Sequence, residues 1–267
     1  MTQTDNVSNA SDNAADKIGT VYLVGAGPGD PGLITVKGLN LLRRADVILY
    51  DRLAPPELLT EAKPGAELID VGKMPTRHRR DQGEINRLLV EHAKAGRLVV
   101  RLKGGDPLVF GRGGEEALAC REAGIPFEIV PGVSSAIAVP AYAGIPVTHR
   151  GITSTFTVFT GHEDPDNPAN QVDYAALAKI GTLIALMGVS HLPNIVEKLL
   201  ANGLNPDTPA VCIEWGTTER QRVVEGTLAT IVQVATEAQI QPPSITVIGS
   251  VVDFRSTGMR WFDEGQL

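Results

Sequence analysis

The signal that decides the fold lies in residues 21–32, which read Val21-Tyr22-Leu23-Val24-Gly25-Ala26-Gly27-Pro28-Gly29-Asp30-Pro31-Gly32. The apolar run predicts a short buried β-strand, and the glycines after it predict a tight turn. Asp30 is well placed as the N-cap of a following helix and Pro31 as its first residue, and we expect that helix to continue over residues 33–44. A strand, a glycine-rich turn and a helix in this order are typical of α/β proteins.

The glycine turn also matches a dinucleotide-binding fingerprint. Gly27, Gly29 and Gly32 have the required spacing, and Asp46 or Asp51 lies about where an acid that binds a ribose is expected. On this ground, a nicotinamide- or flavin-dependent oxidoreductase is one alternative.

The prolines of this turn argue against a diphosphate ligand. A diphosphate is held by backbone N–H groups, which Pro28 and Pro31 lack. The turn therefore suits a sulfonium nucleoside better than a diphosphate. A turn that binds nothing is the other interpretation, because glycine there can serve only to allow a positive φ.

The rest of the chain alternates short β-branched runs with segments of helical period, which favours an α/β fold. Helices are expected at 84–95 and 191–202, each with a glycine directly after it. The expected strands are 20–24, 47–49, 98–102, 127–130, 155–160, 182–186, 210–214, 221–224 and 245–248. Small residues and prolines at 131–146 indicate an inter-domain hinge. We therefore expect a disordered tail at 1–17, an N-terminal α/β domain at 18–133 and a C-terminal α/β domain at 134–260.

Composition limits the partners and the compartment. The 267 residues are 43% hydrophobic and 21% charged, as in an ordinary globular protein, and the net charge of -7 argues against nucleic-acid binding. No apolar run approaches the roughly 20 residues of a membrane span, and the N-terminus has no signal pattern. Cys120 and Cys212 suggest neither a disulfide framework nor a zinc motif. We expect a cytoplasmic protein with no nucleic-acid, membrane or metal partner.

A second glycine-rich loop, residues 103–116, follows the strand expected at 98–102. A loop with so many glycines has a flexible backbone, and such loops usually bind a ligand. In open α/β sheets, ligands bind at the carboxyl ends of the strands, and both glycine loops lie at such ends, as does Asp51.

Four separate motifs resemble those of the tetrapyrrole methylases. They are VGAGPGDP at 24–31, RLKGGDP at 101–107, VPGVSS at 130–135 and GIPVTHR at 144–150. The resemblance covers roughly residues 18–261. It implies an S-adenosylmethionine-dependent methyltransferase with two α/β domains, the cofactor in the cleft between them, and a homodimeric assembly.

The resemblance also implies a set of site residues. The implied cofactor contacts are Pro28, Gly104, Gly105, Asp106, Val109, Ser134, Ser135, Met187 and Gly216. The implied acid/base pair is Asp51 and Lys73. Without the resemblance, Met187 would be a core residue and Asp106 would only start a turn. Trp215 departs from the family's pattern, as do the basic residues at 77–80.

Within the family, the chain is similar to the members that methylate uroporphyrinogen III twice, through precorrin-1 to precorrin-2, for sirohaem or cobalamin synthesis. A porphyrinogen pyrrole carbon is electron-rich, so positioning supplies much of the catalysis and no metal is needed. The methylated ring must then lose a proton, for which Asp51 is the candidate base or stabiliser. A solvated loop aspartate that only caps the helix region at 55–57 is the alternative. Lys73 either donates a proton, holds a substrate carboxylate or is simply solvated.

The eight carboxylates of this substrate match the fixed fork of arginine. We expect Arg52, Arg112 and Arg150 to form a positive patch, with His149 assisting. The remaining alternatives are a later precorrin methyltransferase, the oxidoreductase above and a non-catalytic nucleotide-binding regulator.

Overall fold

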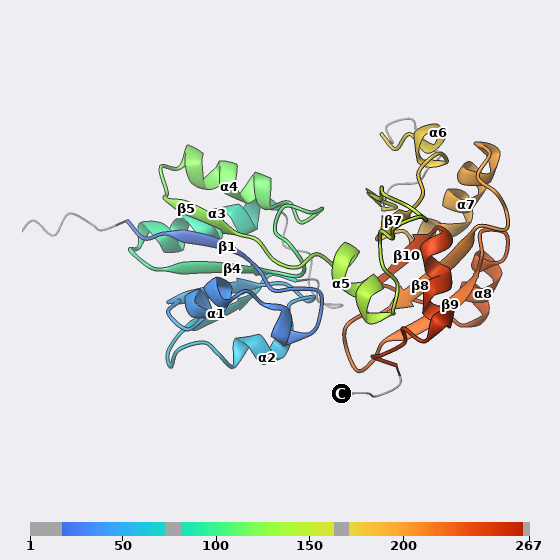
Figure 1. Cartoon of the computed structure of the whole chain (residues 1–267). Coiled ribbons are helices and arrows are strands. Elements are labelled where there is room, and N and C mark those ends of the chain that lie inside the picture. The colour runs from blue at the N-terminus through green and yellow to red at the C-terminus, as the bar shows by residue number, and fades with distance from the viewer. Residues whose placement is uncertain (1–17, 73–81, 163–170, 264–267) are drawn as a thin grey trace, which may run out of the picture.

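The protein folds into two α/β domains, each built on a five-stranded sheet (Figure 1). The computed structural model describes residues 18–72, 82–162 and 171–263. The tail expected at 1–17 lies outside the described residues, as does Lys73. The two-domain α/β fold class predicted from the sequence is confirmed.

The N-terminal sheet is entirely parallel, with the strand order β3-β2-β4-β1-β5. Its strands are β1 Val21–Gly25, β2 Val47–Tyr50, β3 Glu67–Asp70, β4 Val99–Lys103 and β5 Phe127–Val130. The helices of this domain are α1 Val36–Leu42, α2 Pro56–Leu59, α3 Gln82–Lys94 and α4 Gly113–Glu122. In β1, Leu23 packs in one apolar cluster with α3 and α4, and Val24 packs in another with α1 and α2. Because helices cover both faces, the inner strands read as continuous apolar runs.

The C-terminal sheet is mixed, with the order β6-β7-β10-β8-β9. Its strands are β6 Thr157–Thr160, β7 Leu183–Leu186, β8 Pro209–Glu214, β9 Arg222–Thr227 and β10 Ser244–Ile248. Only β6 and β7 are parallel to each other, and the remaining pairs are antiparallel. One face is covered by α6 Tyr174–Leu177, α7 Leu192–Ala201 and α8 Ile231–Glu237, and the other by α5 Ser135–Tyr142 and the 3-10 helix η3 Ser250–Thr257.

Helix α5 connects the two domains. The chain enters it from β5, and its residues Ala136 and Val139 pack with Ile213 and Val247 of the second sheet. Figure 1 shows α5 between the two sheets. The domain boundary expected between residues 133 and 134 places α5 with the second sheet and remains a prediction.

The prediction of a helix at 33–44 is wrong for the first residues of that range. Pro31–Leu33 instead form a 3-10 turn, η1, whose N-cap Asp30 accepts a hydrogen bond from Gly32 N at 2.7 Å. Ile34 is extended, and α1 begins at Val36 with Thr35 as its N-cap. Asp30 therefore caps η1 and not α1, so the glycine turn is longer than its pattern indicated.

Several elements have no clear signal in the sequence. Strand β3, Glu-Leu-Ile-Asp, lies at the sheet edge with mostly exposed residues, so it lacks an apolar run. Helix α4 begins with two glycines, and α5 contains Pro140, which the pattern places in a hinge. Among the helices of the described ranges, none is both long and apolar enough to cross a membrane.

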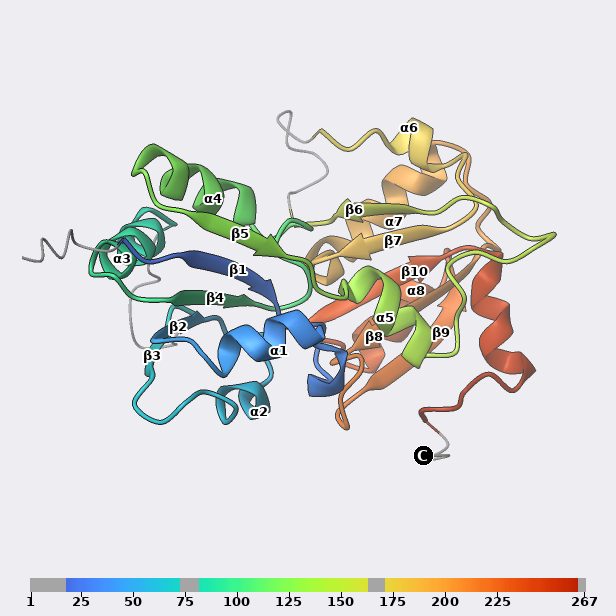
Figure 2. The same ribbon diagram turned by 60° about the vertical axis from the view of Figure 1, so that its left-hand side comes forward.

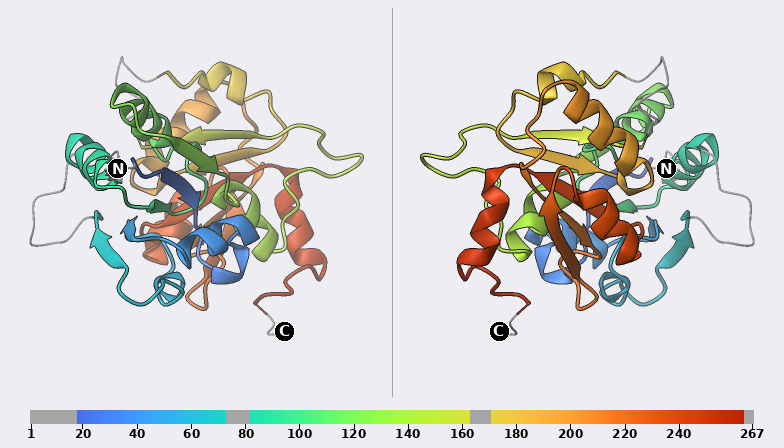
Figure 3. Two further views of the ribbon diagram at one scale, coloured as in Figure 1. Left: turned by 90° about the vertical axis from the view of Figure 1, so that its left-hand side faces the viewer. Right: turned by 90° about the vertical axis from the view of Figure 1, so that its right-hand side faces the viewer.

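The parallel strands of the N-terminal sheet run toward the C-terminal sheet, so the loops after them lie between the two sheets (Figures 1 and 2). Figure 3 views the molecule along this direction from both ends. The fold thereby brings together the loops that carry the glycine motifs.

Candidate active site

Three loops meet at the carboxyl ends of β1, β4 and β5 because β1 lies between the other two strands. Gly27 and Gly105 form a bridge in which Gly105 N donates to Gly27 O at 2.7 Å and Gly27 N donates to Gly105 O at 3.3 Å. A Cβ on Gly25 would lie 2.5 Å from the Cα of Gly132 and 2.6 Å from Gly105 O. Glycine is therefore required here for the close approach of three backbones.

Asp106 fastens the second of these loops to the third. Its Oδ2 accepts from Gly132 N at 3.0 Å, and its Oδ1 accepts from Leu108 N at 2.8 Å. The second contact is the turn-forming bond that an aspartate before proline commonly makes. Each carboxylate oxygen can accept a further bond, so the structural role and a ligand contact are compatible.

The loop after Asp106 exposes apolar side chains and strained backbone. Leu108, Val109 and Phe110 are all exposed, and Phe110 and Arg112 have φ values of 50° and 59°. For residues other than glycine, such values cost energy and cluster at functional sites. Three consecutive exposed apolar residues in a strained loop point to a surface that binds something.

Ser134 and Ser135 stand at the start of α5, beside the same loops. The Ser134 Oγ caps the helix by accepting from Ala136 N at 3.3 Å. A Cβ built on Gly105 would lie 3.9 Å from Ser135 N. The fold thus brings the RLKGGDP and VPGVSS motifs, which are distant in sequence, into one site.

The C-terminal domain meets the first glycine loop at residues 215–218. A Cβ on Gly29 would lie 2.8 Å from Thr217 Oγ1 and 2.6 Å from Thr218 Cγ2. Gly216 is buried against Val139 of α5, where a Cβ would lie 2.7 Å from Cγ2. The predicted contacts at Pro28 and Gly216 therefore lie on two loops that touch each other.

Met187 follows β7 with a φ of 57° and a side chain that is 47% exposed. A core methionine would be buried, so this alternative for Met187 is wrong. An exposed thioether held by a strained backbone at the end of a buried strand is suited to contact a ligand.

Asp51 directly follows β2 and is paired with a buried arginine. Its Oδ2 lies 3.4 Å from an Arg101 terminal nitrogen, and its side chain is 28% exposed. Its Oδ1 accepts from Leu53 N at 3.2 Å, so it also shapes its own turn. Asp51 is thus reachable from solvent on one side and neutralised by a cation on the other.

Arg101 belongs to a buried charged cluster that the sequence interpretation missed. Glu116 Oε1 accepts from Arg101 Nε at 3.0 Å and from Lys103 Nζ at 3.1 Å, and the three side chains are almost fully buried. Glu116 Oε2 is buried without a partner among the described residues. Burial, and then the charge of Arg101, lowers the pKa of Lys103. A signal for this cluster was present, since cations two residues apart in an apolar strand share one face.

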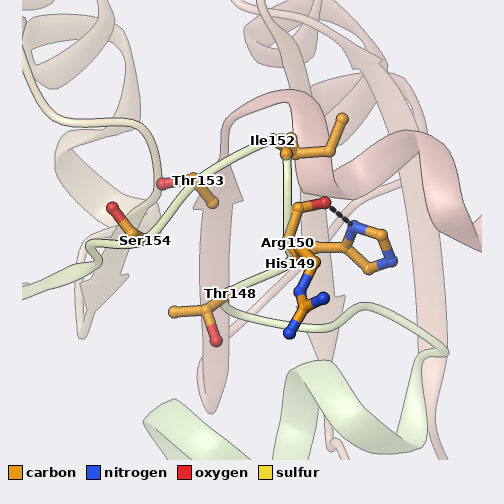
Figure 4. Close-up of a pocket in the computed structure, with 7 residues that line it drawn as sticks. Thr148, His149, Arg150, Ile152, Thr153 and Ser154 are labelled. Carbon is orange, nitrogen blue, oxygen red and sulfur yellow. Dashed lines mark hydrogen bonds between the residues drawn. The ribbon is translucent and has the colours of Figure 1, made fainter.

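Two of the predicted substrate anchors, His149 and Arg150, lie on a turn apart from the loops that carry Arg52 and Arg112. Arg52 is exposed beside Asp51, and Arg112 forms a two-pronged ion pair with Glu115, with both N···O distances at 2.9 Å. The turn at 148–154 carries His149 and Arg150 and lines a separate hollow (Figure 4). In Figures 2 and 3 this turn projects away from the N-terminal sheet. A single patch of Arg52, Arg112 and Arg150 is therefore not formed within the described chain.

The family model of the tetrapyrrole (corrin/porphyrin) methylases matches residues 20–232. The chain belongs to this family. Uroporphyrinogen-III C-methyltransferase of Methanocaldococcus jannaschii is 54% identical to this methylase over 236 residues, 88% of this chain and 97% of that protein. Siroheme synthase 2 of Aeromonas hydrophila is 48% identical over 261 residues, 97% of this chain and 54% of that protein. The crystal structure of uroporphyrin-III C-methyl transferase from Thermus thermophilus complexed with S-adenyl homocysteine has a TM-score of 0.75 at 42% identity, covering 88% of this chain and 93% of that one.

The residues of this methylase fit a cofactor that binds through backbone and apolar groups. The Cβ position of Gly105 is open, with only Ser135 N within 4 Å, and Val109 and Met187 expose apolar side chains. Pro28 supplies no N–H, which suits a nucleoside without a diphosphate. In the described part of the chain, no three His, Cys, Asp or Glu side chains are grouped as metal ligands.

Proposed function

We propose that this methylase transfers two methyl groups from S-adenosylmethionine to uroporphyrinogen III, giving precorrin-1 and then precorrin-2. The names of its relatives from Methanocaldococcus jannaschii and Thermus thermophilus support this substrate and this cofactor. The observation that carries the proposal is the junction of the loops after β1, β4 and β5, where glycine backbones approach one another closely.

The cofactor site we propose lies between the two sheets, where the loops of both domains meet. The proposed contacts are Pro28, Gly104, Gly105, Asp106, Val109, Ser134, Ser135, Met187 and Gly216. When bound, S-adenosylmethionine supplies an electrophilic methyl group on a sulfonium. The loops hold its nucleoside in one orientation, which is the larger part of catalysis for a reactive nucleophile.

We assign Asp51 the removal of the proton that the methylated ring must lose. Arg101 places an opposite charge 3.4 Å from its carboxylate. The exposed side of Asp51 leaves it free to accept a proton. Lys73, which lies outside the described residues, is proposed as its acid partner or as a ligand of a substrate carboxylate.

Arg52, Arg112, His149 and Arg150 are the proposed anchors for the substrate carboxylates. Arg112 is already paired with Glu115, so the substrate must displace or share that partner. We further propose a homodimer, supported by the exposed side chains of Ile152 and Phe156 on and beside the projecting turn. A second copy could receive these apolar groups.

Two further points belong to the proposal. The product would enter sirohaem synthesis, as the name of the Aeromonas hydrophila relative suggests, or cobalamin synthesis. A reducing cytoplasm is the proposed compartment, since Cys120 and Cys212 are buried free thiols whose pKa burial raises to about 11.

The test is anaerobic incubation of the purified protein with uroporphyrinogen III and S-adenosylmethionine, followed by mass analysis of the tetrapyrrole. A gain of one and then two methyl groups supports the proposal. Methylation of a later precorrin in place of uroporphyrinogen III would reassign the substrate. Stabilisation by NAD but not by S-adenosylhomocysteine would favour an oxidoreductase, and binding without turnover would favour a regulator.

A further inference from the structure

The loop between β8 and β9 is folded around the side chain of Gln221. Thr217 N donates to Gln221 Oε1 at 2.9 Å, and Gln221 N donates to Thr218 O at 2.9 Å. Thr218 Oγ1 in turn donates to Trp215 O at 2.7 Å. The amide of Gln221 thereby closes a turn that begins at Trp215.

This turn holds Thr217 in a backbone conformation that it would not adopt unaided. Thr217 has a φ of 67° and is almost fully buried, although it is β-branched. Such a residue is a strong outlier in this region, so its surroundings must fix it. Within the turn, the bond from its N–H to Gln221 Oε1 does this.

Thr217 is also the point at which the two domains' loops join. Its Oγ1 accepts from Asp30 N at 3.1 Å, and the backbone of Gly29 packs against it without room for a Cβ. The position of Thr217 therefore sets the spacing between the Pro28 loop and Gly216.

The other end of Gln221 reaches α5 and the C-terminal segment. Its Nε2 donates to Asp263 Oδ1 at 3.2 Å and to Tyr142 O at 3.4 Å. Tyr142 OH donates to Asp30 Oδ2 at 2.6 Å, and its ring packs against Trp261 with centroids 4.9 Å apart. The contacts form a closed ring that runs from Asp30 through Thr217, Gln221 and Tyr142 back to Asp30.

We propose that Gln221 is a positioning residue for cofactor binding. Its described hydrogen bonds go to residues other than the proposed cofactor contacts, and it fixes Thr217 and thereby the distance between the two loops that carry Pro28 and Gly216. The C-terminal residues Trp261 and Asp263 take part through the same amide and the same tyrosine. This inference rests on the proposed cofactor site.

The test compares Gln221→Ala with Gln233→Ala. Gln233 lies on α8, where it makes one exposed hydrogen bond to Glu237 at 2.8 Å, so it controls for the loss of the same side chain. Calorimetry with S-adenosylhomocysteine and thermal unfolding without ligand are measured for both. We expect Gln221→Ala to raise the dissociation constant at least tenfold while the folded state persists, and Gln233→Ala to leave it unchanged.

A double-variant cycle with Thr217→Ala separates positioning from general stabilisation. If Gln221 acts through Thr217, the two substitutions together weaken binding by much less than the product of their separate factors. The proposal would be overturned if the double variant weakened binding by the full product of the two separate factors. An affinity within twofold of wild type in folded Gln221→Ala would also overturn it. If Gln221→Ala does not fold, Gln221→Met is measured by the same criteria, since it keeps the length of the side chain but lacks the amide that accepts from Thr217 N.

Titration of the wild-type protein distinguishes failure of the proposed cofactor site from failure of the role proposed for Gln221. No binding of S-adenosylhomocysteine by the wild-type protein would overturn both the proposed cofactor site and this inference. Normal binding by wild type and by Gln221→Ala would overturn this inference alone.

Discussion

Glu116→Gln is expected to destabilise the protein far more than the same substitution at the neighbouring Glu115. Glu116 is fully buried and accepts from both Arg101 and Lys103, whereas Glu115 is half exposed and pairs with Arg112 at the surface. Both stand in the first turn of α4, so the loss of a negative charge near a helix N-terminus is common to the two variants. The difference between them therefore isolates the buried cluster.

The magnitude follows from what remains after the substitution. Among the described residues, Arg101 keeps Asp51 as a counter-charge, 3.4 Å away and partly exposed, and Lys103 loses its direct partner. Removing one partner of a buried ion pair costs about 3–5 kcal/mol, and a surface pair is worth about 0–1 kcal/mol. For a unit of about 150–250 residues, about 1 kcal/mol shifts the melting temperature by roughly 2–4 °C, so Glu116→Gln should melt roughly 6–20 °C lower when the two domains unfold together.

The loss of stability caused by Glu116→Gln should also depend on pH. Burial holds the pKa of Lys103 below its usual value in the folded protein, and removing Glu116 lowers that pKa further. Between the folded and unfolded pKa values, the unfolded chain binds more protons, so stability there rises with pH. Because the folded pKa of Lys103 is lower in Glu116→Gln, the pH range between its folded and unfolded pKa values extends further down in the variant. The variant's deficit relative to wild type should therefore be larger at pH 6 than at pH 9.

The assay is chemical and thermal unfolding of wild type, Glu115→Gln and Glu116→Gln at pH 6, 7.5 and 9. A deficit for Glu116→Gln no greater than that for Glu115→Gln would refute the buried ion cluster. A large deficit that does not change with pH would keep the cluster but refute the part assigned to Lys103.

Three further outcomes are expected. Asp51→Asn should lower single-turnover methyl transfer by roughly 10²- to 10⁴-fold while S-adenosylhomocysteine affinity hardly changes, and a parallel fall of both would make its role structural. Gly105→Val should weaken S-adenosylhomocysteine binding in a folded protein, because Gly105 has a φ of 68° and an open Cβ position; unchanged affinity by calorimetry would contradict this. Raising the ionic strength should increase the Michaelis constant for the tetrapyrrole more than that for the cofactor, whereas equal salt dependence would argue against arginine anchors for the substrate carboxylates.

The elements that the sequence predicted well are those whose signal is local. The apolar run of β1 and the helix at Gln82–Lys94 are visible as periodic patterns, and the glycine turn after β1 is visible as composition. Strand β3 and helix α5 were not predicted, because β3 is an exposed edge strand and α5 contains Pro140. Their conformations are set by packing on neighbouring strands, which no local pattern reports.

The candidate site also has features that the sequence predicted and features that only the tertiary structure shows. The family resemblance named Gly105, Asp106, Met187 and Asp51 as site residues, although their contacts with a ligand remain predictions. The sequence by itself determined the residue types at strand ends: glycines where backbones approach, and an aspartate after β2. Only the tertiary structure decided that Asp106 joins two loops by a hydrogen bond and that Asp51 lies beside Arg101. It also decided that the turn carrying Arg150 projects away from the N-terminal sheet. The physical reason is that these relations depend on strand order, which places β1 between β4 and β5 and so joins segments about 80 and 110 residues apart.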